Sequence, residues 1–218
     1  IDGTLIRWQL YHAVVHKLGK AGQLAPGDFE AINAARMTWK NRRTNEGFHD
    51  YEAQLVERFK AALKHVDPAV YDQVIDEVFD EYKDQIFTYT RDLVHELKAK
   101  GYLLFAISGS PQEAIEKLAK HHGFDDTIAG VFTRKNGRFT GEFTTPIFDK
   151  KAALETLVKK HHATFAGSYA VGDSASDAAM LSIVEHPIAF SPDQNLFDIA
   201  KQKGWPIVVE RKNVVYEL

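Results

Sequence analysis

The sequence contains no cysteine in its 218 residues. Disulfide bonds, thiolate metal sites and cysteine nucleophiles are therefore excluded for these residues, which fits a reducing cytoplasm as the expected location. No apolar run approaches membrane-spanning length, and the start, where a short apolar stretch gives way at once to mixed polar sequence, does not resemble a signal peptide. These absences predict a soluble protein without a membrane partner.

A block of basic residues is also missing, and the formal net charge is -3 at pH 7. Proteins that bind nucleic acid usually carry a strong Lys/Arg footprint, so nucleic acid is not expected as the main ligand. The length and the near-average apolar content suffice for one globular unit with a substantial core and a small second lobe.

The first part of the chain has a helical pattern. From Trp8 to Phe87, apolar residues recur three and four positions apart, and no strand pattern interrupts them. The predicted helices are Phe29–Trp39, Tyr51–Leu63 and Val70–Phe87.

From Tyr89 onward, short apolar runs alternate with amphipathic segments, which is typical of parallel strands joined by crossover helices. Asn136-Gly137, between strand-like residues, predicts a two-residue hairpin turn. We therefore expect an α/β core, interrupted near its N-terminus by an all-helical insertion. The predicted strands are Leu103–Ile107, Ile128–Phe132, Tyr169–Val171, Ile188–Phe190 and Ile207–Val209.

A turn after the first of these strands has the features of a phosphate site. Ser110 is a candidate N-cap, with Pro111 at the first helical position and Glu113 completing a capping box. Ser108 and Gly109 would then lie at a helix N-terminus, whose free N–H groups and dipole favour a phosphate. An ordinary capped turn between a strand and a helix has the same features, so the turn alone assigns no function.

Two acidic residues follow the apolar run Tyr169–Val171. Asp173 would lie at the carboxyl edge of the sheet and Asp177 in the first turn of the next helix, where open α/β sheets bind ligands. Hard oxygen donors at that edge suit magnesium. In the alternative interpretation, Asp173 ends a strand while Ser174 and Asp177 cap a helix, and the fragment alone favours neither.

Lys150 is a cation at the expected start of a helix, where the helix dipole disfavours positive charge. It follows Asp149, a natural N-cap, and begins the amphipathic segment Lys150–Lys160, where a cation opposes the helix dipole. A phosphate at the sheet edge would explain this placement. The alternative is a solvated lysine, tolerated at a cost of about a few tenths of a kcal/mol.

Together with the start of the chain, Ile1–Leu5, these fragments resemble the haloacid dehalogenase superfamily, most closely its phosphoserine-phosphatase-like branch. The first motif of that family reads Asp-x-Asp-Gly-Thr. Asp2 matches its second aspartate, and the first, the nucleophile, is expected immediately before Ile1. The resemblance implies a Rossmann-like three-layer parallel-sheet core in residues 1–8 and 88–218, with an inserted helical cap domain in residues 9–87.

The other motifs follow in the family's order: Ser108 matches the second, Lys150 the third, and Asp173 with Asp177 the fourth. The resemblance implies a phosphatase that forms an aspartyl-phosphate and acts on a small phosphorylated metabolite. Its cofactor would be Mg²⁺, held by the preceding aspartate, the backbone carbonyl of Asp2 and the side chain of Asp173. Asp177 would orient the metal site without binding the metal itself.

In the same scheme, the side chain of Asp2 protonates the leaving oxygen and later deprotonates the attacking water. Ser108, Lys150 and the backbone N–H groups around Gly109 and Ser110 would stabilise charge on the phosphoryl oxygens.

The resemblance extends to the helical insertion. Within Asp50–Arg58, Arg58 stands at the position that binds a substrate carboxylate, although a solvated surface arginine is the alternative. Gln9 stands where those enzymes place a glutamate that recognises the substrate. Because an uncharged amide pairs less well with an ammonium group, the resemblance does not extend to a preference for phosphoserine.

Two other functions fit the same motifs. One is a noncatalytic phosphate-binding or regulatory module that kept the fold and lost the chemistry. The other is a phosphotransferase that delivers the phosphoryl group to an acceptor other than water. Release of phosphate by the full-length protein without an added acceptor distinguishes the phosphatase from both.

Overall fold

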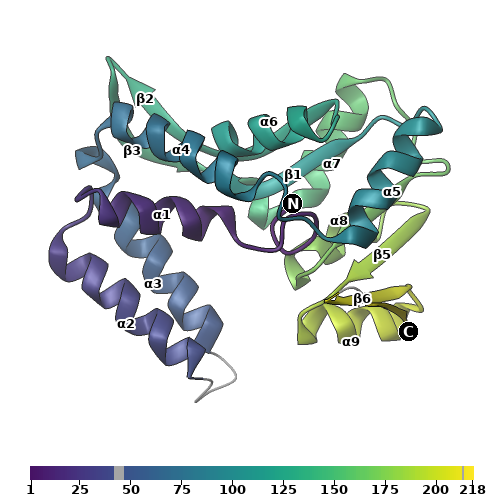
Figure 1. The fold of residues 1–218 in the computed structure, drawn as a ribbon. Helices are drawn as coiled ribbons and strands as arrows, with labels where there is room; N and C mark the ends of the chain where they lie inside the picture. The colour runs from purple at the N-terminus through teal and green to yellow at the C-terminus, as the bar shows by residue number, and fades with distance from the viewer. Residues whose placement is uncertain (42–46, 213) are drawn as a thin grey trace. The chain divides into compact units, whose positions relative to one another are not determined.

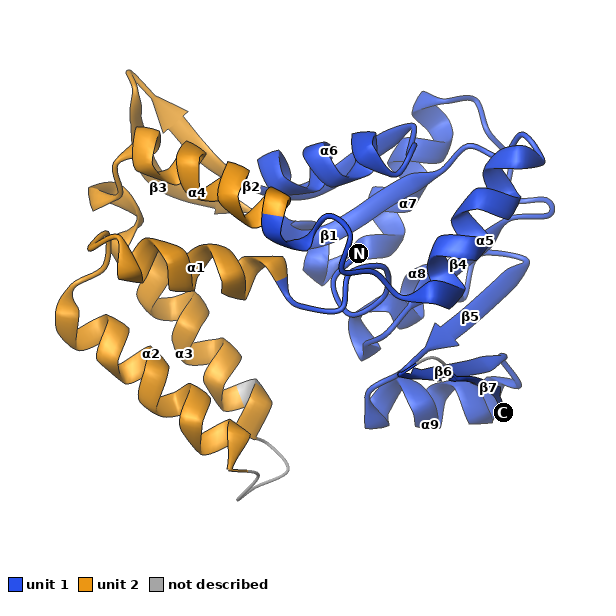
Figure 2. Ribbon diagram, in the orientation of Figure 1, with its two compact units in different colours: residues 1–9, 81–130, 145–218 blue, residues 10–80, 131–144 orange. Residues whose placement is uncertain are grey.

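The computed structural model describes residues 1–41, 47–212 and 214–218. The chain divides into two compact units (Figure 2). Unit 1 comprises Ile1–Gln9, Glu81–Gly130 and Thr145–Leu218, and unit 2 comprises Leu10–Asp80 and Val131–Thr144. The boundaries expected from the sequence differ from this division mainly at residues 131–144, which join the helical segment.

Unit 1 alternates strands and helices (Figure 1). Strand β1 pairs with β2 in parallel, as do β4 with β5 and β5 with β6, while β7 runs antiparallel to β6. Its elements are α5 (Thr88–Ala99), β1 (Phe105–Pro111), α6 (Gln112–His121), the first half of β2 (Asp126–Lys135), η2 (Pro146–Phe148), α7 (Lys150–Lys160), β4 (Tyr169–Gly172), η3 (Ala175–Asp177), α8 (Ala178–Leu181), β5 (His186–Phe190), α9 (Gln194–Lys203), β6 (Ile207–Arg211) and β7 (Val214–Glu217).

The two faces of the sheet formed by β4, β5 and β6 are covered by different helices. Ala189 of β5 packs in a buried cluster with Leu181 of α8 and Leu196 of α9. Its neighbours Ile188 and Phe190 point to the opposite face, where Leu93 of α5 packs against them. Because successive strand residues face opposite sides, this alternation produces three layers, as expected for a Rossmann-like core.

Unit 2 is built from helices and one β-hairpin. Asn136 and Gly137 have φ angles of 51° and 72°, as a two-residue hairpin turn with both central residues left-handed requires, so the predicted turn is confirmed. Its elements are α1 (Leu10–Lys20), α2 (Pro26–Lys40), α3 (Gly47–Ala62), η1 (Leu63–His65), α4 (Pro68–Tyr82), the second half of β2, and β3 (Arg138–Thr144).

Aromatic packing explains why the hairpin belongs with these helices. Phe132 and Phe139 are buried, and their rings contact Tyr71 of α4 at centroid distances of 6.0 and 5.0 Å. Phe132 also contacts Phe59 of α3 at 5.3 Å. The apolar pattern near residues 128–132 predicted a strand correctly, but it did not indicate which helices would cover it.

The helix predicted over Val70–Phe87 ends at Tyr82. After a turn at residues 83–84, residues 85–87 pair with the start of the chain. The N–H of Arg7 donates to the carbonyl of Gln85 (2.8 Å), and the N–H of Phe87 donates to the carbonyl of Leu5 (2.9 Å). This long-range pairing replaces the helical hydrogen bonds that the local pattern predicted.

The predicted capping box at Ser110 is also wrong. Strand β1 continues to Pro111, and the helix begins at Gln112 without a side-chain cap. The N–H of Ser110 donates to Ser108 Oγ at 3.0 Å, which holds Ser110 in the strand end rather than at a helix cap. Among the described residues, no helix combines the length and the apolar character needed to cross a membrane.

The buried carboxylate of Glu210 joins the N-terminal segment, β6 and α5. It accepts hydrogen bonds from the N–H groups of Thr88 (3.1 Å) and Tyr89 (2.9 Å), at the start of α5. It also pairs with Arg7. A carboxylate hidden from water loses its hydration, and these donors together with the positive end of the helix replace it.

We expect Glu210→Ala to lower the free energy of unfolding by about 2 to 4 kcal/mol, because it leaves two partly buried N–H groups and Arg7 without their acceptor. Urea denaturation measures this loss. Glu96→Ala removes an exposed carboxylate paired with Lys100 and is the matched control, expected to change stability little. Equal effects of the two substitutions would contradict the role given to Glu210.

Candidate active site

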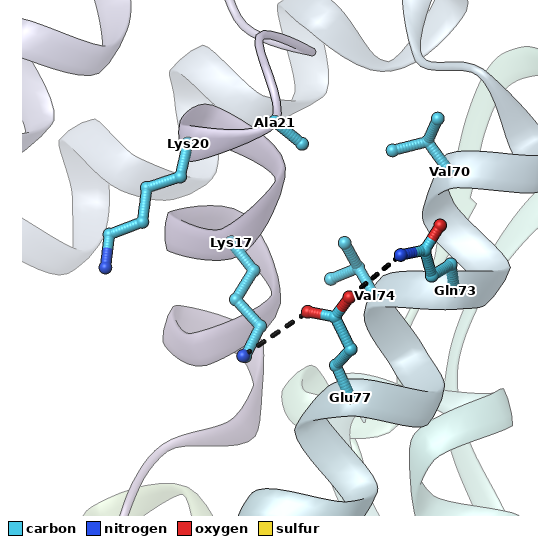
Figure 3. Close-up of a pocket in the computed structure, with 7 residues that line it drawn as sticks. All are labelled: Lys17, Lys20, Ala21, Val70, Gln73, Val74 and Glu77. Carbon is cyan, nitrogen blue, oxygen red and sulfur yellow. Dashed lines mark hydrogen bonds and ion pairs between the residues drawn. The ribbon is translucent and has the colours of Figure 1, made fainter.

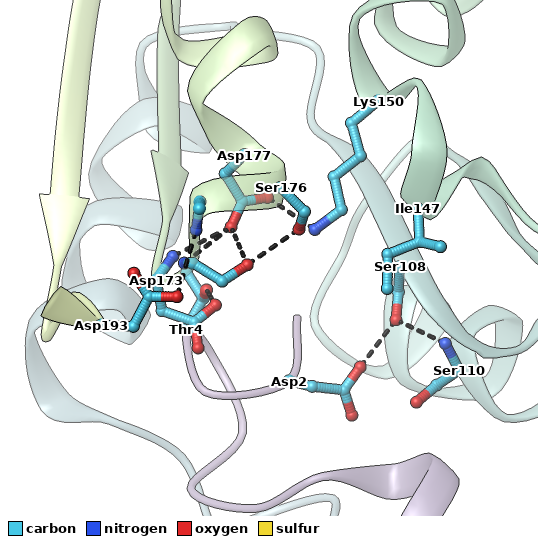
Figure 4. Close-up of polar contacts among 12 residues, drawn as sticks. Asp2, Thr4, Ser108, Ser110, Ile147, Lys150, Asp173, Ser176, Asp177 and Asp193 are labelled. Carbon is cyan, nitrogen blue, oxygen red and sulfur yellow. Dashed lines mark hydrogen bonds and ion pairs between the residues drawn. The ribbon is translucent and has the colours of Figure 1, made fainter. Parts of the chain in front are cut away.

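The N-terminal loop is shaped to approach Asp173. Gly3 has a φ of +68°, and a Cβ at this position would lie 2.0 Å from Asp173 Oδ2. A side chain is therefore excluded by the contact as well as by the backbone conformation. Thr4 Oγ1 donates a hydrogen bond to Asp173 Oδ1 at 3.1 Å (Figure 4). These contacts bring the first and fourth predicted motifs together, and they give Thr4 a positioning role that the sequence analysis did not assign.

A second contact joins the first motif to the end of β1. Ser108 Oγ donates to Asp2 Oδ2 at 2.6 Å and accepts from the N–H of Ser110 at 3.0 Å. Ser108 and Ser110 are both buried. Gly109 lies between them, and a Cβ on it would be 3.2 Å from Ile147 Cδ1. The predicted phosphate-binding turn is therefore packed tightly, and its serine orients the carboxyl group of Asp2.

Asp177 connects the third and fourth motifs. Its Oδ1 accepts from Lys150 Nζ at 2.6 Å, and its Oδ2 accepts from the N–H of Asp173 at 3.1 Å (Figure 4). The N–H of Ser174 also donates to Oδ2, at 3.1 Å. The carboxylate is nearly inaccessible to water, and Gly172 allows its approach, because a Cβ there would lie 2.4 Å from Asp177 Cβ.

Lys150 begins α7 as predicted, and Asp149 caps that helix by accepting from the N–H of Ala152 at 2.9 Å. The unfavourable position of the lysine relative to the helix dipole is offset by its ion pair with Asp177, in which both side chains are largely buried. A lysine ammonium has three donors, so this bond leaves further donors for a ligand.

Asp193 is a residue of the site that sequence analysis missed. Its N–H donates to the carbonyl of Asp173 at 2.8 Å, while its Oδ1 caps α9 by accepting from the N–H of Leu196 at 2.7 Å. Its Oδ2 accepts from the N–H of Ala175 at 3.2 Å. An aspartate directly before an amphipathic helix is an N-cap signal, and this could have identified it.

Burial and the nearby carboxylate of Asp177 raise the pKa of Asp173 to about 6. Such a carboxyl group favours a bound cation, because the cation stabilises the ionised form that burial disfavours. The described residues contain no group of three His, Cys, Asp or Glu side chains that could hold a metal ion. The carboxylate oxygens of Asp173, which is partly buried, are the hard donors that Mg²⁺ prefers, and the remaining ligands would come from other groups.

Two predicted residues are not members of this network in the described part of the chain. Gln9 ends the first segment of unit 1, directly before α1. Arg58 belongs to α3 of unit 2, where its guanidinium donates to Asp28 Oδ1 at 2.5 Å. Arg58 therefore has a local ion-pair partner that sequence analysis did not foresee.

Unit 2 has a separate hollow between α1 and α4 (Figure 3). Its polar groups bind one another: Glu77 accepts from Lys17 Nζ at 3.5 Å and from Gln73 Nε2 at 3.0 Å. The other lining residues are Lys20, Ala21, Val70 and Val74. This arrangement contains neither the paired acids nor the serine turn of unit 1, so we place the candidate chemistry in unit 1.

Residues 1–182 match the model of the haloacid dehalogenase-like hydrolases. The chain belongs to this family. The alternating strands and helices of unit 1 agree with this membership.

Relatives within the family include phosphoserine phosphatases. SerB1 of Mycobacterium tuberculosis is 29% identical over 153 residues, which cover 69% of this chain and 47% of that protein. The phosphoserine phosphatase of Lactococcus lactis subsp. lactis is 26% identical over 193 residues, covering 87% and 80%. The chain spans about half the length of the mycobacterial relatives it matches.

A solved phospho-aspartyl intermediate analogue of phosphoserine phosphatase has the same fold. It superposes with a TM-score of 0.63 at 22% identity, covering 98% of this chain and 91% of that one.

We expect Gly172→Ala to destabilise the protein by about 1 to 3 kcal/mol, because the added methyl group overlaps the buried side chain of Asp177. Gly27→Ala is the control: its Cβ would meet nothing within 4 Å, and alanine favours the helix that contains it. Urea denaturation of both variants measures the difference. A Gly172→Ala protein as stable as the Gly27→Ala protein would contradict the packing described here.

The raised pKa of Asp173 predicts a pH-dependent stability of the metal-free protein. Protonated Asp173 places no charge in the partly buried site, so its protonation stabilises the folded protein. This contribution to the free energy of unfolding is fully present below about pH 4, the pKa of an unfolded aspartic acid, and is lost as pH rises through about 6. Asp173→Asn stays neutral, so we expect its Tm in EDTA to exceed that of the wild type at neutral pH by on the order of a few degrees. At pH values below both pKa values this advantage should vanish.

Asp126→Asn is the control of opposite sign. Burial opposes the shift, but hydrogen bonds from Lys160 and His161 lower the pKa of Asp126 to about 2. Ionised Asp126 therefore stabilises the folded protein at neutral pH, and this contribution is lost as pH falls through about 2. The Asp126→Asn variant should be less stable than the wild type at neutral pH. Identical pH profiles for the wild type and Asp173→Asn would contradict the burial of Asp173.

Proposed function

We propose that this chain forms the catalytic core of a magnesium-dependent phosphatase, which hydrolyses a small phosphorylated metabolite through an aspartyl-phosphate. The observation that carries the proposal is the hydrogen-bond network of unit 1, in which Asp2 contacts Ser108, Thr4 contacts Asp173, and Lys150 contacts Asp177. Membership of a hydrolase family and the phosphoserine phosphatase relatives support it.

Magnesium would be held by the side chain of Asp173, the backbone carbonyl of Asp2 and the aspartate expected before Ile1. When bound, it would neutralise charge on the phosphoryl oxygens and so reduce repulsion of the attacking carboxylate. Asp177 would act on this site indirectly, since its Oδ2 fixes the N–H of Asp173.

In the first step, the carboxylate expected before Ile1 attacks phosphorus, and the bond to the leaving oxygen breaks. Asp2 gives its proton to that oxygen, which leaves as the alcohol. In the second step, water attacks phosphorus, Asp2 takes up the water proton, and the bond to the aspartate breaks to release phosphate. The hydrogen bond from Ser108 orients the carboxyl group of Asp2 for both transfers.

The remaining groups would bind the phosphoryl oxygens. Lys150 keeps donors beyond its bond to Asp177. The turn Ser108–Ser110 would supply a hydroxyl group and backbone N–H groups, but the N–H of Ser110 donates to Ser108 Oγ, so a phosphate must compete for it. The hydroxyl group of Ser108 donates to Asp2, so a phosphate must compete with Asp2 for that donor.

Unit 2 would act as a cap that recognises the rest of the substrate, with Arg58 as a candidate contact, and Gln9, at the end of the first segment of unit 1, would be a second. Arg58 already pairs with Asp28, so a substrate carboxylate must share or replace that ion pair. With a neutral amide at position 9, recognition of a substrate ammonium group should be weak.

The decisive test compares two proteins that differ only in the residue before Ile1, aspartate in one and asparagine in the other. We expect the aspartate protein to release phosphate from a generic phosphomonoester only with Mg²⁺ present, and the asparagine protein to lose at least about a thousandfold in kcat, because the amide is no nucleophile. Phosphate release assayed without an added acceptor is the measurement. Metal-independent turnover, or turnover by the asparagine protein, would exclude this mechanism, and a requirement for an acceptor would indicate phosphotransfer.

The substrate contact is tested separately. If Arg58 binds a carboxylate, Arg58→Ala should raise KM about tenfold for phosphorylated acids and leave phosphorylated amines or alcohols unchanged. Asp28→Asn frees the same guanidinium and should lower KM for the acids. If both variants treat acids and neutral esters alike, Arg58 serves only its ion pair, and the reaction in unit 1 is unaffected.

A further inference from the structure

The turn before Lys150 exposes two apolar side chains. In η2, Phe148 is the most exposed large apolar residue described, at 88%, and Ile147 is 39% exposed. An exposed phenyl ring next to an ionic site is unfavourable in water, and it adds nothing to the packing of the core.

The backbone of this turn is held on both sides. Thr145 Oγ1 accepts from the N–H of Ile147 at 3.3 Å, and the N–H of Asp149 donates to the carbonyl of Pro146 at 2.9 Å. Asp149 then caps α7. The two apolar side chains therefore project from a fixed segment, which reduces the entropy lost when a ligand packs against them.

The turn also lies against the candidate phosphate site. The side chain of Ile147 comes so close to Gly109 that a Cβ there would be 3.2 Å from Ile147 Cδ1. Figure 4 shows Ile147 beside Ser108. Lys150, which would bind a phosphoryl oxygen, follows Phe148 by two residues. Ile147 thus adjoins the turn that would bind the phosphate, and the exposed Phe148 is the next residue of the same 3-10 helix.

We propose that Ile147 and Phe148 form one wall of the leaving-group subsite, and that the substrate is a phosphate monoester whose alcohol part carries an aromatic or similarly flat apolar surface. The inference rests on the proposed phosphatase function and adds a substrate class to it. A ring packed on Phe148 gains by leaving water and by aromatic contact, whereas a short alkyl group offers too little surface for either.

The test uses the full-length protein and two esters of similar alcohol reactivity, benzyl phosphate and ethyl phosphate. Phe148→Ala should lower kcat/KM for benzyl phosphate about tenfold, mainly through KM, and change that for ethyl phosphate by less than about twofold. Phe148→Tyr keeps the ring and should retain the preference for the benzyl ester. Tyr216→Ala, which removes a half-exposed aromatic group from β7, is the control and should change neither value.

Equal losses on both esters, or no loss on either, would overturn the subsite. Binding of benzylphosphonate and ethylphosphonate, which cannot be hydrolysed, separates this outcome from failure of the proposed function. If the wild type hydrolyses neither ester, the phosphatase proposal fails, but a preference for benzylphosphonate that Phe148→Ala abolishes still supports the subsite. Equal affinity of the wild type for the two phosphonates would overturn it.

Discussion

The carboxylate of Asp177 is the group on which the geometry of the candidate site depends. One oxygen holds the ammonium group of Lys150, and the other accepts from the backbone at Asp173 and Ser174. Because the group is buried, each of these bonds forms with little competition from water. The end of β4 and the start of α7 are thereby held together, and Gly172 is needed to let the carboxylate approach.

This arrangement would favour a bound cation and would lower the stability of the metal-free protein at neutral pH. Asp173 is partly buried beside a second carboxylate, which disfavours its charged form. A magnesium ion and a phosphate would bring opposite charges that match the carboxylates and Lys150. The same burial that costs stability without metal therefore favours binding, which is a common feature of functional sites.

Much of the site could be predicted because its residues follow strands or begin helices in short segments. The end of a strand and the first turn of the next helix lie at the same edge of a parallel sheet, so Asp173 and Asp177 could be expected near one another, as the hydrogen bond between them shows. The ion pair of Lys150 with Asp177 joins residues 27 positions apart, and no local pattern signals it. Asp193 was overlooked because its cap signal lies outside the family motifs.

The errors arose from contacts that helix periodicity and capping patterns do not encode. The apolar periodicity predicted a helix over Val70–Phe87. The helix ends at Tyr82, and residues 85–87 pair with the N-terminal segment instead. The sequence around Ser110 has the composition of a capping box, yet Ser108 takes the N–H that would have been free. Likewise, the partner of Arg58 is Asp28, 30 residues away in another helix. Local propensity decides such positions only where no tertiary partner competes.

The affinity of Asp177→Asn for Mg²⁺, measured by calorimetry on the full-length protein, tests the organising role of this carboxylate most directly. Asp177 would supply no ligand to the metal, but its loss would release both Lys150 and the backbone of Asp173. We predict an affinity lower by about tenfold to a hundredfold, with the fold intact by circular dichroism. An unchanged Mg²⁺ affinity would show that the metal site does not depend on Asp177 and would contradict this account.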